Sequence, residues 1–261
     1  MTPLPASFLR VPIAHRGLHD RPAGRVENSR AAFAAAVALG VAIELDVQPS
    51  SDGVAMAFHD YDLARLTGRT GPVSGLTAAA LGETGLRDGG ESVPTLAEAL
   101  AVVAGRVPVL IEVKDQDGAM GPTVGPLEDA VLAALAGYGG DVAVMSFNPH
   151  SVAHLAARAP DLPRGITTAA FTAEDWPLLP AATRARLAGI PDVARTGAGF
   201  VSHDRRALGM PRVAELKAAG LPVLCWTVRS AAQEAEARRI ADTVTFEGYL
   251  PDLTEAPPSG A

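Results

Sequence analysis

The sequence predicts an α/β protein built as a (β/α)8 TIM barrel. Apolar runs that suit buried strands alternate with helix-like segments along the chain. Setting aside one hairpin arm, eight strands begin near residues 11, 41, 107, 142, 164, 199, 222 and 243, with helices between them. A doubly wound sheet would alternate in the same way, but the first strand–helix turn lacks the G-x-G-x-x-G motif. The length of 261 residues suits one barrel, so we expect a single domain over 1–261.

Composition indicates a well-filled core and narrows the range of partners. Hydrophobic residues make up 48% of the chain and charged residues only 20%, which argues against disorder. The net charge of −7 argues against binding to nucleic acid or to an anionic membrane. Cys225 is the single cysteine, so an internal disulfide is excluded. No apolar run reaches membrane-spanning length and no signal-peptide pattern opens the chain, so we expect a cytoplasmic protein without stable membrane insertion.

Capping residues and glycines set the expected element boundaries. Asn28 or Ser29 caps the first helix, Gly40 ends it, and Thr95 caps the next helix. The expected strands are 9–16, 41–47, 107–113, 142–147, 164–169, 199–203, 222–228 and 243–247. The expected helices are 29–39, 95–104, 126–137, 149–158, 174–188, 211–219 and 230–239, and the glycine-broken stretch 61–93 is expected to be loop-like.

The stretch 41–60 carries the strongest functional signal. Glu44 and Asp46 are two residues apart in an otherwise apolar strand, so both carboxylates face the same side. Only five residues separate this run from the next glycine turn, too few for a parallel crossover, so the following apolar run should return as an antiparallel hairpin arm. That geometry brings His59 to the level of Asp46.

Barrel enzymes gather their chemistry at the carboxyl ends of the strands, and this sequence follows that rule. Polar or aromatic residues that can bind a ligand or react lie at these ends: His15-Arg16, Glu44 and Asp46, Glu112 and Lys114, Ser146, Thr168, Ser202-His203, Trp226-Thr227 and Glu247. We therefore expect the functional site at this end of the barrel.

Three carboxylates predict a metal site. Glu44, Asp46 and Glu112 supply hard oxygen ligands from neighbouring strands, which suits Mg²⁺ or Ca²⁺. Two carboxylates on one apolar strand face are costly to bury unless a cation lies between them. The alternative is that these groups form ion pairs with Arg16 and Lys114.

Two histidines and two cations extend this site. His15 and His59 offer imidazoles with an unperturbed pKa near 6.5, which suits proton transfer at neutral pH. His15 could instead be a packing residue and His59 a hairpin cap. Arg16 and Lys114 add positive charge beside the expected metal, a combination that attracts an oxygen-bearing anion such as phosphate.

Taken together, these motifs resemble the glycerophosphodiester phosphodiesterase family. The matching residues run in order from 13 to about 248: His15-Arg16-Gly17, Glu27-Asn28, Glu44-Leu45-Asp46-Val47, Asp52-Gly53, His59-Asp60, Glu112-x-Lys114, Ser146-Phe147 and Trp226-Thr227-Val228. Each piece is weak by itself, whereas the joint pattern is specific. The resemblance implies a metal-dependent barrel phosphodiesterase in which 61–93 is a small insertion over the active site, after the hairpin of the second strand.

The resemblance also implies roles for single residues. His15 and His59 would be the catalytic pair, and Trp226 would face the alcohol group. The metal ligands would be Glu44, Asp46 and Glu112, and the phosphate contacts Arg16 and Lys114. Two places depart from the family pattern: Arg229 stands where Asn is usual after Trp-Thr-Val, and the last strand, which usually ends in Thr-Asp, here ends in Thr245-Phe246-Glu247. Both departures concern the alcohol-binding side.

The predicted function is hydrolysis of a glycerophosphodiester to glycerol 3-phosphate and an alcohol. We assign His15 as base and His59 as acid, with water or a neighbouring substrate hydroxyl as nucleophile. A lysophospholipid phosphodiesterase is a rival from the same class, and an apolar surface on 61–93 would distinguish it. A Schiff-base aldolase using Lys114 and a non-catalytic phosphate-binding barrel are rivals from other classes. The expected partner is a small phosphodiester.

Overall fold

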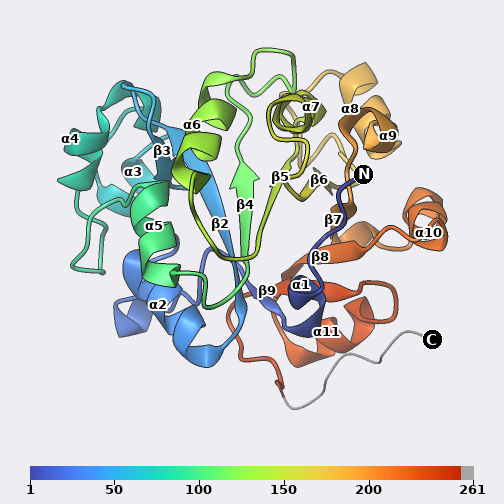
Figure 1. Ribbon diagram of the computed structural model, residues 1–261, viewed down its shortest axis with the longest axis horizontal. Coiled ribbons are helices and arrows are strands. Elements are labelled where there is room, and N and C mark those ends of the chain that lie inside the picture. The colour runs from blue at the N-terminus through green and yellow to red at the C-terminus, as the bar shows by residue number, and fades with distance from the viewer. Residues whose placement is uncertain (254–261) are drawn as a thin grey trace. The chain divides into compact units, whose positions relative to one another are not determined.

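The computed structural model describes residues 1–253, and its fold class is the (β/α)8 barrel that the sequence predicted (Figure 1). The parallel barrel strands are β1 (Ile13–Ala14), β2 (Ala42–Pro49), β4 (Val109–Val113), β5 (Val142–Ser146), β6 (Arg164–Thr168), β7 (Phe200–Asp204), β8 (Val223–Val228) and β9 (Thr243–Phe246). β3 (Ala55–Ala57) is the return arm of the β2 hairpin.

Helices connect these strands. They are α1 (Ser7–Arg10), α2 (Arg30–Leu39), α3 (Ala64–Thr67), α4 (Ala78–Gly82), α5 (Leu96–Val103), α6 (Pro126–Leu135), α7 (Pro149–Arg158), α8 (Ala181–Ala188), α9 (Val193–Thr196), α10 (Pro211–Ala218) and α11 (Ala231–Ala237). Among residues 1–253, none of the helices has both the length and the apolar character that crossing a membrane requires.

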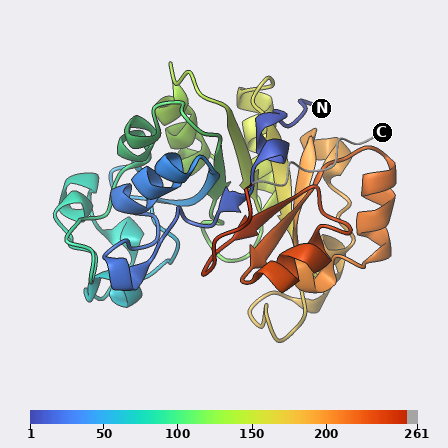
Figure 2. The same ribbon diagram turned by 90° about the horizontal axis from the view of Figure 1, so that it is seen from below.

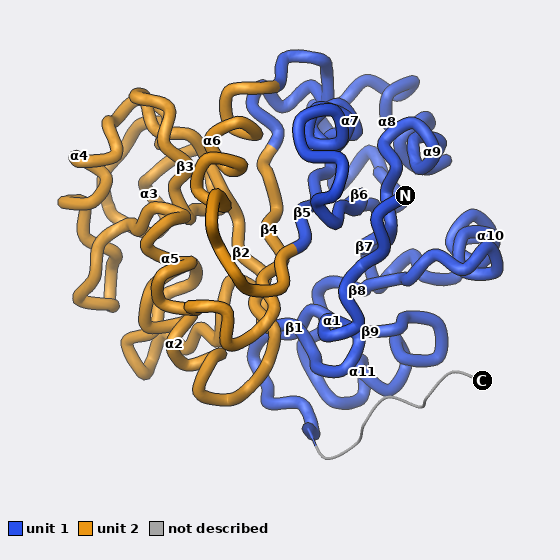
Figure 3. The backbone as a smooth tube through the Cα atoms, viewed as in Figure 1, with its two compact units in different colours: residues 1–13, 115–124, 143–261 blue, residues 14–114, 125–142 orange. Residues whose placement is uncertain are grey.

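The chain divides into two compact units (Figure 3). Unit 1 comprises residues 1–13, 115–124 and the chain from 143 onward, and it contains the parallel strands β5 to β9. Unit 2 comprises residues 14–114 and 125–142, and it contains β2, β3 and β4.

In unit 2, β2 pairs with an antiparallel strand on one side and with a parallel strand on the other. β2 pairs antiparallel with β3, with Val47 opposite Ala57, and the Phe58 N–H donates to the Asp46 carbonyl over 3.0 Å. β2 pairs parallel with β4, which sets Asp46 directly beside Glu112. The predicted antiparallel hairpin is therefore confirmed, although Phe58, one residue before His59, lies opposite Asp46.

The helices of unit 2 begin and end at the capping residues that the sequence indicated. The Ser29 hydroxyl accepts the Ala32 N–H at the start of α2, and Gly40 ends that helix in the left-handed conformation. Thr95 and Glu98 form a capping box at the start of α5. α2 and α5 pack against each other on the outer side of this unit (Figure 1).

Residues 61–93 form no long element, as expected, but they have a core of their own. α3, α4 and a 3₁₀ turn at Val73–Gly75 are the only regular elements in this segment. Its apolar side chains pack against Val26 and against Met56 and Phe58 of the hairpin arm. The buried members from the segment are Leu63, Leu66, Val73, Leu81, Leu86 and Val93.

Unit 1 is a parallel sheet with a helix layer against it, and Figure 2 shows the strands from below. The side chains of Ile166, Val201, Val223 and Val244 alternate into one apolar cluster with the helix residues. Cys225 belongs to this cluster and is fully buried, and burial raises the pKa of its thiol to about 12. These facts indicate an inert core thiol.

Two sequence-based boundaries are wrong. In the expected strand 9–16 only β1 forms a strand, because Phe8 and Leu9 donate to the carbonyls of the residues three before them and form a short helix that buries Phe8. In the expected helix 174–188 only the second half is helical. Pro177 and Pro180 lack an N–H and disfavour helix in the residue before them, so α8 begins after Pro180. α1 and α9 were not predicted.

Candidate active site

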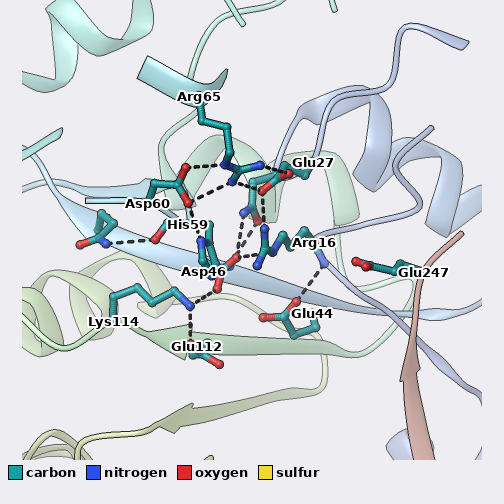
Figure 4. A network of polar contacts seen from close by, with 12 residues as sticks. Arg16, Glu27, Glu44, Asp46, His59, Asp60, Arg65, Glu112, Lys114 and Glu247 are labelled. Carbon is teal, nitrogen blue, oxygen red and sulfur yellow. Dashed lines mark hydrogen bonds and ion pairs between the residues drawn. The ribbon is translucent and has the colours of Figure 1, made fainter. Parts of the chain in front are cut away.

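Three carboxylates converge in unit 2 (Figure 4). Glu44 and Asp46 extend from one face of β2, and Glu112 lies on β4 beside Asp46. Each offers a carboxylate oxygen within 4.8 Å of the other two. Their exposed fractions are 2%, 1% and 6%, so three like charges are brought together away from water. The structure therefore assembles the predicted ligand set.

Two cations compensate part of this charge. The Lys114 ammonium lies 2.6 Å from Asp46 Oδ1 and also contacts a Glu112 oxygen. The Arg16 guanidinium lies 3.3 Å from Asp46 Oδ2, and the Arg16 backbone N–H donates to Glu44 Oε2 over 2.8 Å. The ion pairs that the sequence left open as an alternative are thus present together with the clustered carboxylates.

The carboxylate pKa values show that this compensation is uneven. Burial, reinforced by the charges of Asp46 and Glu112, raises the pKa of Glu44 well above its ordinary value. Burial would also raise the pKa of Asp46, but Lys114, the two histidines and Arg16 outweigh it and lower that pKa. Three carboxylates face two cations, so the donor set has room for more positive charge. Hard oxygen donors in this arrangement fit a divalent cation such as Mg²⁺ or Ca²⁺.

The loop after β1 is held against the carboxylates. Asn28 Nδ2 donates to Asp46 Oδ2 over 2.9 Å, and the Asp46 N–H donates back to Asn28 Oδ1 over 3.2 Å. Arg16 and Asn28 both have a φ of 55°, a conformation rarely adopted outside glycine. Gly17 follows with a φ of 78°, and a Cβ there would lie 3.0 Å from Ala32 atoms. This strained backbone is the kind found where a site is held in a fixed geometry.

Both predicted histidines lie within electrostatic reach of Asp46. The His59 Nδ1 atom is 2.7 Å from Asp60 Oδ1, and the His59 carbonyl accepts the Gln48 side-chain N–H over 3.1 Å. His15 follows β1 and is partly buried. The charges of His59 and His15 both help to lower the pKa of Asp46, so both imidazoles lie near this carboxylate.

Sequence reasoning missed Arg65. It lies on α3, five residues after Asp60, and its guanidinium contacts both Asp60 and Glu27. In the sequence, only its position shortly after the His-Asp pair distinguishes Arg65, because the surrounding segment is predicted to be loop-like. Glu27 was noted within a motif without a role. In the structure it contacts Arg16 as well as Arg65.

Trp226 belongs to unit 1 and forms part of an aromatic cluster. Its indole N–H donates to the Ser202 carbonyl over 3.0 Å, and its ring lies edge-on to Phe147 with centroids 5.4 Å apart. Phe171 and Trp176 complete the aromatic cluster, with centroids 5.0 Å apart. Trp226 stays partly exposed, which is compatible with a binding role as well as with packing.

The two departures from the family pattern contact each other. The Arg229 Nε atom donates to Glu247 Oε1 over 2.7 Å, and both residues belong to unit 1. The two residues therefore form an ion pair between the ends of β8 and β9.

Comparison with known proteins gives a consistent result. The model of the glycerophosphoryl diester phosphodiesterase family matches residues 15–245. A glycerophosphodiester phosphodiesterase from Caldanaerobacter subterraneus subsp. tengcongensis is 31% identical over 173 residues, covering 63% of this chain and 69% of the relative. Among solved structures, a glycerophosphodiester phosphodiesterase from Agrobacterium tumefaciens has a TM-score of 0.65 and 25% identity, with 94% and 96% of the two chains covered. An Oleispira antarctica phosphodiesterase in complex with the product sn-glycerol-3-phosphate shares the fold, with a TM-score of 0.72, 24% identity and coverage of 92% and 94%.

Proposed function

This chain belongs to the glycerophosphoryl diester phosphodiesterase family, and from that membership we propose a metal-dependent enzyme that hydrolyses glycerophosphodiesters to glycerol 3-phosphate and an alcohol. The observation that carries the proposal is the buried convergence of Glu44, Asp46 and Glu112, with both histidines beside it. These carboxylates would hold Mg²⁺ or Ca²⁺. When bound, such a cation polarises a phosphoryl oxygen and stabilises developing charge.

The chain's own residues supply the remaining functions. The guanidinium of Arg16 and the ammonium of Lys114 offer positive charge to the phosphate oxygens. His15 takes the proton from the nucleophile, which is water or a neighbouring substrate hydroxyl. His59 gives a proton to the departing alkoxide from Nε2, because its Nδ1 is engaged by the acceptor oxygen of Asp60.

The structure of 61–93 favours a small soluble diester over a lysophospholipid. A lipid substrate would require apolar side chains on the surface of this segment. Its buried leucines, such as Leu63 and Leu81 at 1% and 0% exposure, face the apolar cluster shared with the hairpin arm instead, and Tyr61 is the large apolar side chain that the segment exposes. We therefore propose that a glycerophosphodiester with a polar alcohol group is the preferred substrate.

The environment of Lys114 argues against a Schiff-base aldolase. A nucleophilic lysine needs a lowered pKa so that the neutral amine is available. Burial alone would have that effect, but the charges of Asp46 and Glu112 overcome it and raise the pKa of Lys114. The ammonium stays charged and suits phosphate binding better than amine chemistry.

A substrate panel tests the proposal. Glycerophosphocholine, -ethanolamine, -glycerol and -inositol, together with lysolipids, are assayed after chelation and after adding back Mg²⁺ or Ca²⁺. We expect release of glycerol 3-phosphate from the polar diesters, loss of activity on chelation, and a rise in melting temperature on adding metal. Full activity in a demonstrably metal-free sample would contradict the metal-dependent mechanism. The predicted cytoplasmic location is a separate matter that cell fractionation tests.

A further inference from the structure

A single guanidinium on the 61–93 segment contacts two carboxylates of the candidate active site (Figure 4). Arg65 Nε lies 2.5 Å from Asp60 Oδ2, and its Nη2 donates to Asp60 Oδ1 over 3.0 Å. The same side chain donates from Nη1 to Glu27 Oε2 and from Nη2 to Glu27 Oε1, both over 2.7 Å. Both carboxylates are therefore held by paired hydrogen bonds.

Each of these carboxylates has a second partner in the candidate active site. Asp60 Oδ1 is 2.7 Å from His59 Nδ1, the ring atom that faces away from the assigned proton donor Nε2. Glu27 Oε1 is 2.5 Å from Arg16 Nη1, which belongs to the assigned phosphate-binding arginine. Arg65 thus contacts the carboxylate that holds the proposed acid, His59, and the carboxylate that holds a proposed phosphate contact, Arg16.

We propose that Arg65 is a positioning residue for hydrolysis, which fixes His59 through Asp60 and Arg16 through Glu27. This inference rests on the proposed function, because it assigns a role to contacts of His59 and Arg16. Asp60 can orient the imidazole only while its own carboxylate is held in place. Arg65 provides that restraint from the segment that follows the His-Asp pair.

The geometry distinguishes this arrangement from an ordinary surface ion pair. An exposed pair between flexible side chains contributes little, and many contribute nothing measurable. Here the planar guanidinium, although its side chain is 46% exposed, makes two-point contacts with two carboxylates whose side chains are only 23% and 13% exposed. Asp60 and Glu27 are like charges brought to one cation. Without Arg65 they would repel each other and move away from the ring and the guanidinium that they hold.

The chemistry requires a guanidinium and not merely a positive charge. Lysine places one compact ammonium at the end of a flexible chain, so it can contact one carboxylate at a time. Arg65→Lys should keep the net charge and the fold but lose the simultaneous hold on Asp60 and Glu27. Arg69 offers a matched control on the same segment, since it is exposed and its guanidinium contacts only the Thr84 hydroxyl at 3.4 Å among the interactions of the described residues.

The experiment compares kcat and KM of Arg65→Ala, Arg65→Lys and Arg69→Ala on glycerophosphocholine, with melting temperatures for each variant. A catalytic group misplaced by about 1 Å can cost about 10²-fold, so we expect Arg65→Ala to lower kcat by about that factor. KM should rise several-fold through Arg16. Arg65→Lys should recover only part of the loss, and Arg69→Ala should stay within twofold of the parent chain.

A double variant separates positioning from general support of the fold. If Arg65 acts through His59, adding Arg65→Ala to His59→Ala should lower kcat far less than it does in the parent chain. Arg65→Ala should also lose less activity on a nitrophenyl ester than on glycerophosphocholine, because nitrophenolate departs without protonation. Guanidinium ions in solution should restore part of its activity.

Two results would overturn the inference. One is an Arg65→Ala variant whose kcat matches that of the parent chain. The other is a reduction of kcat by Arg65→Ala that is equally large in the parent chain and in His59→Ala, as expected for a purely structural residue. In either case the parent chain would still hydrolyse glycerophosphocholine, and the proposed function would stand. A parent chain that hydrolyses none of the glycerophosphodiesters would overturn both proposals.

Discussion

The carboxylate site of unit 2 and the aromatic cluster of unit 1 hold their side chains by different physical means. In the carboxylate site, Asp46 is fixed by a hydrogen bond from Asn28 over 2.9 Å and by ion pairs with Arg16 and Lys114 at 3.3 and 2.6 Å. In the aromatic cluster, Phe147 packs against three other rings with centroids 5.0 to 6.2 Å apart. The first depends on charge and direction, and the second on shape and area.

This difference predicts how each region responds to substitution. Removing one member of a buried ion-pair network leaves its partners uncompensated, so the loss should be large and concentrated in the chemical step. Removing one ring of a cluster leaves the other rings in contact, so the loss should be graded and should follow the shape of the substrate. The predictions below test this distinction, beginning with the largest expected effect.

Asp46→Asn should have the largest effect. The substitution keeps the size of the side chain but removes the charge on which Lys114, Arg16 and the proposed metal depend. We expect kcat to fall by at least about 10³-fold, the upper end of what loss of one electrostatic group costs. The melting temperature of Asp46→Asn should also no longer rise when Mg²⁺ or Ca²⁺ is added.

Asp52→Asn is the matched control for this variant. Asp52 lies in the turn of the same hairpin, where its carboxylate accepts from the Ser50 hydroxyl and the Ala78 N–H. The activity of Asp52→Asn and its rise in melting temperature on adding metal should equal those of the parent chain. Retention of the metal-induced stabilisation by Asp46→Asn would show that the cation binds elsewhere.

Alanine variants of the two histidines should differ in how their activity depends on the leaving group of the substrate. If His59 is the acid, His59→Ala should lose about 10²–10⁴-fold on an alkyl diester, whose alkoxide departs poorly without a proton. The same variant should keep much of its activity on a nitrophenyl ester. His15→Ala removes the base and should impair both substrates alike. If only His15→Ala regains activity on the nitrophenyl ester, the two roles are reversed. If neither variant regains activity on it, neither histidine is a simple leaving-group acid.

The contrast between the two regions also explains what the sequence could predict. Strand periodicity brought Glu44 and Asp46 to one face, and barrel topology brought Glu112 beside them, because these placements follow from backbone geometry. The caps Ser29 and Thr95 were equally readable, since capping is local. Local pattern and fold class together were enough to predict the fold class and the convergence of the three carboxylates.

The parts that escaped prediction depend on contacts between distant residues. Arg65 meets Glu27 across 38 positions of sequence, through a segment whose short helices have no strong periodicity. The ion pair between Arg229 and Glu247 likewise joins two strand ends, and each residue alone read only as a departure from a pattern. Even the wrong strand over 9–16 has this origin, because burial of Phe8 favours a helical turn.

Trp226→Ala should have a smaller and selective effect. If the indole faces the alcohol group, its loss should lower kcat/KM by about tenfold, the lower range for removing apolar contact from a binding pocket. The reduction should differ among the choline, ethanolamine, glycerol and inositol diesters, whereas metal-induced stabilisation should be unchanged. Trp226→Phe should recover most of the loss. An equal reduction on every substrate, confined to kcat, would remove the proposed difference between the aromatic cluster and the carboxylate site.

The smallest effects should come from helix caps, and they test whether both regions belong to one folding unit. Thr95 caps α5 in unit 2, and Ser230 caps α11 in unit 1 by accepting the Gln233 N–H. Replacing either by alanine should cost about 1 kcal/mol of the free energy of unfolding, or about 2–4 °C in melting temperature for a chain of this size. Neither change should alter kcat, since neither residue contacts the charged network. Each unit by itself would expose the unpaired edges of an incomplete sheet, so we expect both variants to shift the same single calorimetric transition. Two transitions, with Thr95→Ala moving one and Ser230→Ala the other, would show instead that the carboxylate site and the aromatic cluster fold independently.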